Sequence, residues 1–117
     1  SSLTNLVSAI HKIVNEKEVD QIKLQIDKLI SKVQIENGQL KERVNSVINV
    51  HKEISKINNE PIDENLLFNS IWEQNVKNVT FDNAISNLNK LENELKTKFL
   101  DFDYNKKLSE FKEIICI

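Results

Sequence analysis

The 117-residue sequence has one glycine, one proline, one cysteine and no methionine. Because tight hairpins depend on turn residues, this composition excludes a many-stranded fold, and a single glycine excludes a glycine-rich phosphate loop. The lone Cys116 excludes an internal disulfide and fits a reducing compartment. No apolar run reaches the roughly 18 residues that a membrane-spanning helix needs, so we expect no transmembrane segment.

Acidic and basic residues are interleaved, and the net charge is −2. There is no basic face that could neutralise a phosphate backbone, so nucleic acid is not an expected partner. The two histidines, His11 and His51, have no second ligand at metal-binding spacing. No nucleophile has a base within helical reach. The sequence therefore predicts no catalysis, no cofactor and no metal site.

The strongest positive signal is a heptad pattern between Val19 and Ile57. With Val19 at position a, the a positions are Val19, Ile26, Val33, Leu40, Val47 and Ile54. The d positions are Ile22, Leu29, Glu36, Arg43, Val50 and Ile57. A seam of this period packs one narrow stripe against other helices, so we expect the whole seam to face a core.

The apolar pattern predicts four helices: a short one at 3–15, a long one at 18–58, one at 61–78 and a long one at 81–115. The stripe changes phase at 15–18, which favours a turn or bend. It changes again at 101–105, which suggests a kink or a short linker before a final helix. Pro61 must end the long helix, because it lacks an N–H. Asn37-Gly38 is a turn signal, but the seam keeps its register across it, so a continuous helix is favoured over a break.

These helices predict an all-α fold with a single domain covering 1–117. The expected architecture is an antiparallel three- or four-helix bundle with long coiled-coil-like helices, built on a long antiparallel hairpin. An unbroken helix over 18–58 would span roughly 60 Å at about 1.5 Å per residue. That exceeds what a compact bundle of this mass requires, which indicates a helical partner or a homo-oligomer.

Six residues are candidate partner contacts. Glu36 and Arg43 interrupt the d positions and could specify register with a partner. Trp72, the only tryptophan, is either a core anchor or an interface hot spot. The apolar tail contributes Ile114, Ile115 and Ile117, and we expect it to pack on the bundle unless a longer chain continues there.

The function that fits is a non-enzymatic helical protein–protein interaction module. It would be a subunit or domain of a larger cytoplasmic or nuclear assembly, such as a tethering, cytoskeletal, kinetochore or transcription-scaffold complex. The alternative is a surface or secreted helical protein of an AT-rich pathogen that binds a host factor. Heavy use of Asn, Lys and Ile, and the glycosylation pattern Asn78-Val79-Thr80, support that alternative.

Overall fold

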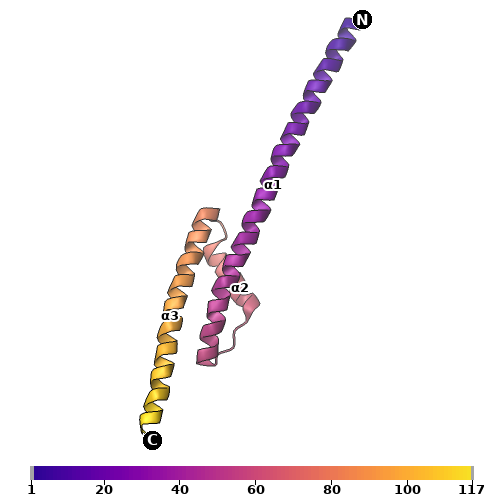
Figure 1. Cartoon of the computed structure of the whole chain (residues 1–117). Helices are drawn as coiled ribbons and strands as arrows, with labels where there is room; N and C mark the ends of the chain where they lie inside the picture. Colours follow the sequence, from indigo (N-terminus) through magenta and orange to yellow (C-terminus); the bar gives the residue numbers. More distant parts are fainter. Residues whose placement is uncertain (1, 117) are drawn as a thin grey trace. The chain divides into compact units, whose positions relative to one another are not determined.

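The structure, a computed structural model, describes residues 2–116 and their side chains through Ile115 (Figure 1). It contains three helices, α1 (Ser2–Asn58), α2 (Glu64–Asn75) and α3 (Phe81–Cys116), and no strand in the described part of the chain. The all-α class is therefore confirmed. The chain divides into two units, one ending at Asn37 and one starting at Gly38, which are described separately below.

Helix α1 is a single helix where the sequence predicted two. The turn expected at 15–18 is absent, because Asn15-Glu16-Lys17-Glu18 interrupts the apolar stripe without supplying a glycine or proline to stop the helix. Gly38 also lies inside α1, as predicted, and its φ is not positive. The change of phase at 15–18 therefore moves the apolar stripe to another face of the same helix.

Local chemistry fixes the end of α1 and the start of α2. Asn59 follows α1 with a φ of 55°, in the left-handed region that often ends helices. The predicted helix at 61–78 would begin at Pro61, but α2 begins at Glu64. Asp63 is the N-cap instead, and its Oδ1 accepts a hydrogen bond from the Leu66 N–H at 3.2 Å.

The connection from α2 to α3 is similarly short. Asn78 has a φ of 64°. Thr80 Oγ1 then accepts a hydrogen bond from the Asn83 N–H at 3.3 Å, which satisfies one of the free donors at the start of α3. Helix α2 thus ends at Asn75, three residues before the predicted end at 78.

The core lies entirely in the second unit and draws on all three helices. Val44 and Val47 of α1, and Ala84 and Leu88 of α3, have no exposed surface at all. The buried apolar residues of the described chain are Leu40, Val44, Val47, Ile48, Ile71, Val76, Ala84, Leu88 and Leu95. Ile71 brings α2 into this core, with Leu67, Phe68 and Trp72 packed at its edge.

The two long helices run parallel within the second unit. Arg43 pairs with Glu92, and further along both helices a groove is lined by Ile54 of α1 and Phe102 of α3. Figure 1 shows α2 crossing behind α1 as it returns the chain toward the start of α3. The predicted long antiparallel hairpin is therefore wrong, because α2 carries the chain back before α3 begins and α3 repeats the direction of α1.

Candidate helix-binding surfaces

The first unit is one helix whose large apolar side chains all lie at the surface. Each of them is at least 41% exposed. They are Leu3, Leu6, Val7, Ile10, Ile13, Val14, Val19, Ile22, Leu24, Ile26, Leu29, Ile30, Val33 and Ile35. A helix in water gains most of its stability from packing an apolar face. This stretch therefore has the composition of a packed helix without the packing.

All of these side chains except Leu24 and Ile35 form two stripes on different faces of α1. The first stripe consists of Leu3, Leu6, Val7, Ile10, Ile13 and Val14. The seam stripe consists of Val19, Ile22, Ile26, Leu29, Ile30 and Val33. Successive residues are about 100° apart around a helix, so the centres of the two stripes differ by roughly 140°. One straight partner helix cannot cover both stripes.

The seam stripe has the same register as the buried face of α1. Leu40 and Val47 continue its a positions and are buried, whereas Ile26 and Val33 occupy the same heptad position and are exposed. The expectation that the whole seam faces a core is therefore wrong for the part of the seam that precedes Leu40. Within the second unit, the buried residue is Val44 rather than its neighbour Arg43, which occupies the d position. A straight helix repeats every 3.6 residues rather than 3.5, so its buried face drifts away from a strict heptad pattern.

A third exposed stripe lies on the C-terminal half of α3. This α3 stripe consists of Leu100, Tyr104, Leu108, Phe111 and Ile115, with exposures from 37% to 65%. By helical geometry its centre is roughly 170° from the line of core residues Leu88 and Leu95. The predicted kink at 101–105 is absent, since α3 is unbroken. As in α1, the phase change moves the stripe to another face.

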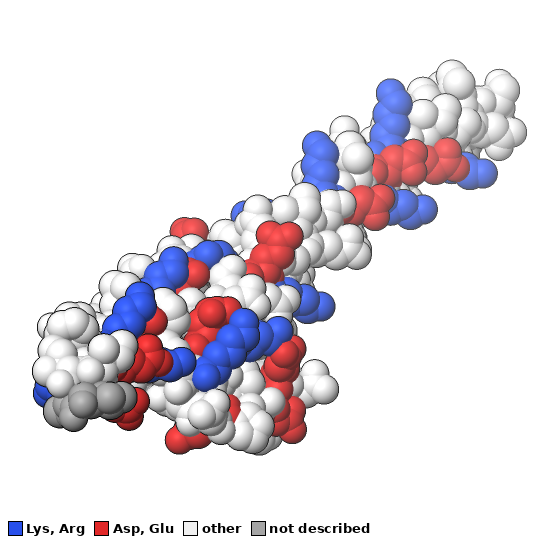
Figure 2. Space-filling view, turned by 60° about the horizontal axis from the view of Figure 1, so that its bottom comes forward, with Lys and Arg blue, Asp and Glu red and all other residues white. Residues whose placement is uncertain are grey.

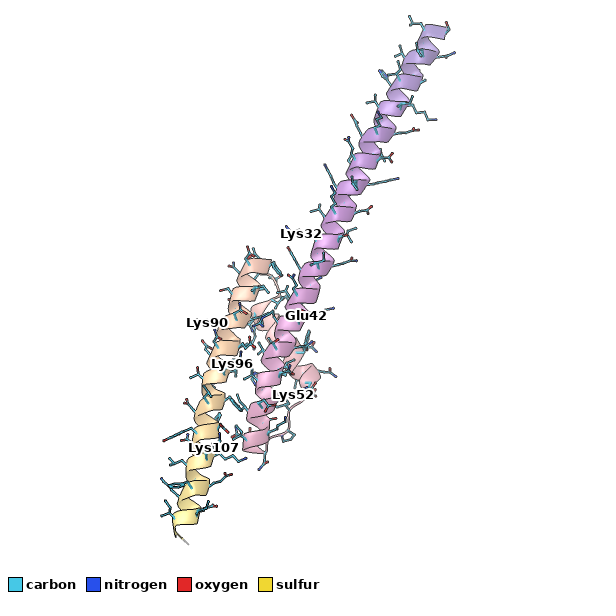
Figure 3. The ribbon with its side chains drawn as sticks, viewed as in Figure 1. Lys32, Glu42, Lys52, Lys90, Lys96 and Lys107 are labelled. Carbon is cyan, nitrogen blue, oxygen red and sulfur yellow. The ribbon has the colours of Figure 1, made fainter. Side chains whose placement is uncertain are left out.

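The structure gives Arg43 an internal partner. Its Nη2 donates to Glu92 Oε2 of α3, and Lys96 Nζ lies 3.5 Å from the other carboxylate oxygen, Glu92 Oε1 (Figure 3 labels Lys96). Its Nε is buried without a hydrogen-bond partner in the described part of the chain. Arg43 therefore forms an ion pair inside the second unit, and its role as a partner contact stays a prediction. Glu36 is half-buried, and its Oε1 lies 3.9 Å from Lys32 Nζ on the same helix.

Trp72 acts as an anchor at the edge of the core. It is half-buried and its ring is stacked on Phe68, with centroids 5.8 Å apart. Ile114 and Ile115 are 71% and 64% exposed, so the expectation that the tail packs on the bundle is wrong for these two. Ile117 lies outside the described residues.

No group of three or more metal-ligating side chains occurs in the described part of the chain. None of the helices, over these same residues, is long and apolar enough to cross a membrane. On the face drawn in Figure 2, acidic and basic side chains alternate rather than gathering into a patch of one sign.

A groove along the parallel helices is lined by apolar side chains, among them Leu95 and Phe102, and by polar ones that include His51 and Lys98. Burial lowers the pKa of His51, and the nearby positive charge of Lys98 lowers it further. The groove thus favours a neutral imidazole. The sequon at Asn78 is exposed, but Thr80 already has a structural role as the cap of α3.

Comparison with protein-family models, with curated proteins and with solved structures found no match to this chain.

Proposed function

We propose that this chain is a non-enzymatic protein–protein interaction module that binds helices of a partner in a larger assembly. The second unit is the folded base, and the first unit presents the binding surface. The observation that carries the proposal is that every large apolar side chain of α1 before Leu40 is at least 41% exposed.

Energetics support a helical ligand for the seam stripe. A buried Val, Leu or Ile side chain contributes about 1.5–3 kcal/mol relative to an exposed one. The a and d positions from Val19 to Val33 are all 41% to 62% exposed, so a facing helix would bury roughly half of each side chain anew. The summed gain is of the order of 5 kcal/mol before the entropic cost of association. Knobs at heptad spacing fit the holes of another helix better than any flat surface.

The chain offers a matched pair of leucines to test this proposal. Leu29 lies in the seam stripe and is 62% exposed, whereas Leu24 lies outside it and is 55% exposed. The full-length protein is purified from its native cells with its bound partners, and Leu29→Asp and Leu24→Asp are compared with the wild type. We expect Leu29→Asp to lose the partner and Leu24→Asp to keep it.

Thermal unfolding of the purified variants provides the control. Both substitutions lie outside the core, so the melting temperature of the second unit should match the wild type in each case. Equal partner recovery from both variants would contradict a seam-specific contact. A large loss of thermal stability in Leu29→Asp alone would show that the seam is packed within the chain itself.

A further inference from the structure

We propose that two copies of this chain associate through the C-terminal half of α3, as an antiparallel pair with its twofold axis near residue 106. The contact surface is the α3 stripe, which points away from the core side of α3 marked by Leu88 and Leu95. This surface is separate from the seam stripe, so the dimer and the proposed function can fail independently.

The apolar residues of the α3 stripe match in this alignment. When residue 106 of both helices lies at the same level, Leu100 faces Phe111 of the second copy and Tyr104 faces Leu108 of the second copy. The twofold axis repeats both pairings, which gives four consecutive apolar layers. The overlap from 97 to 115 spans about 28 Å at a rise of about 1.5 Å per residue. All four side chains are exposed in the single chain.

The charges beside the stripe select the antiparallel direction. One edge carries Asp101 and Lys112, and the other carries Asp103 and Lys107, whose Oδ2 and Nζ are 2.9 Å apart (Figure 3 labels Lys107). In an antiparallel pair equivalent edges face each other. Asp101 of each copy then faces Lys112 of the other, so the twofold axis gives two such pairs. On the other edge, Asp103 and Lys107 of both copies form a neutral cluster of four charges.

A parallel pair would place opposite edges together. Asp101 of one copy would then lie beside Asp103 of the other on both sides of the contact, and like charges in such positions repel. The antiparallel pair also uses one self-complementary surface, so it closes as a dimer and does not extend into a filament. Its modest length places it at the low end of specific interfaces, so we expect dissociation in the micromolar range.

Sedimentation equilibrium of the full chain, from about 1 to about 300 µM, measures this association. We expect a monomer–dimer equilibrium that Leu108→Asp abolishes. Lys112→Glu should raise the dissociation constant about tenfold, because two favourable pairs become repulsive. Lys106→Glu makes the same charge change on the opposite side of α3 and should have little effect.

The charge-swap variant is the decisive test of direction. Asp101→Lys and Lys112→Glu each weaken an antiparallel dimer, whereas the double variant restores both pairs and should return the dissociation constant to within about threefold of the wild type. Circular dichroism of each variant checks that the helices still form, so a failure to fold cannot imitate a loss of association.

Disulfide trapping gives an independent readout. In a Cys116→Ser background, Leu100→Cys and Phe111→Cys proteins should cross-link when mixed, and neither should cross-link alone, because a disulfide requires close Cβ atoms. Cross-linking of each protein with itself would overturn the antiparallel pair. So would a monomer throughout the concentration range, or a dimer that Leu29→Asp disrupts and Leu108→Asp does not.

Discussion

Val33→Ala and Val47→Ala form the sharpest test of where the core of this protein begins. Both valines occupy position a of the heptad seam, but Val47 is fully buried and Val33 is 54% exposed. Deleting two buried methyl groups from Val47 costs about 1.6 kcal/mol in transfer free energy, and the cavity adds up to about 1 kcal/mol. The better helix propensity of alanine returns about 0.5 kcal/mol. The net destabilisation should be about 2 kcal/mol.

Val33→Ala should behave differently. Without a partner helix, the half-exposed side chain loses little burial, and the gain in helix propensity offsets that loss. We expect a change within about 0.5 kcal/mol. Urea unfolding followed by Trp72 fluorescence and by circular dichroism measures both variants, and Val47→Ala should lower the midpoint by about 1 M. Equal destabilisation by the two substitutions, at a protein concentration too low for association, would refute the division into a packed and an unpacked seam.

Substitutions at three further positions address local features of the chain. Gly38→Ala should stabilise the protein by roughly 1 kcal/mol, because Gly38 is helical and an added Cβ meets nothing within 4 Å; a lowered melting temperature would contradict a helical Gly38. Burial and Lys98 lower the folded-state pKa of His51 below the ordinary 6.5, so its contribution to stability is present above about pH 6.5 and declines as the pH falls below that value. His51→Gln should flatten this part of the pH profile in urea titrations, and an unchanged slope would exclude His51 as its source. Asp63→Ala should destabilise the protein by about 1 kcal/mol through loss of the α2 cap, whereas Asp63→Asn keeps a side-chain oxygen and should lose much less by calorimetry.

Several features could be predicted from the sequence because they depend on neighbouring residues only. The scarcity of turn residues and the apolar spacing indicate an all-helical chain, and the structure agrees. Pro61 marks the break after α1. The unchanged register of the seam across Gly38 indicates an unbroken helix there, which the structure also has.

The two phase changes show where local reasoning fails. At 15–18 and at 101–105 the stripe shifts, and a turn or kink would keep all of it on one core. In the structure both helices instead continue unbroken, and the apolar stripe moves to a second face of the same helix. Sequence spacing records that the face changes. Sequence spacing does not record whether the helix bends so that the apolar face stays on one core, because bending depends on which other helices pack against it.

The sequence by itself determined that these residues form helices, which faces of the helices are apolar, and where Pro61 separates α1 from α2. Only the tertiary structure decided which of those faces is buried. Ile26 and Val47 are equivalent in the heptad, yet one is exposed and the other is in the core. The pairing of Arg43 with Glu92, and the parallel direction of α1 and α3, likewise follow from α2 returning the chain. The physical reason is that periodicity is a property of one segment, whereas burial requires two segments to meet.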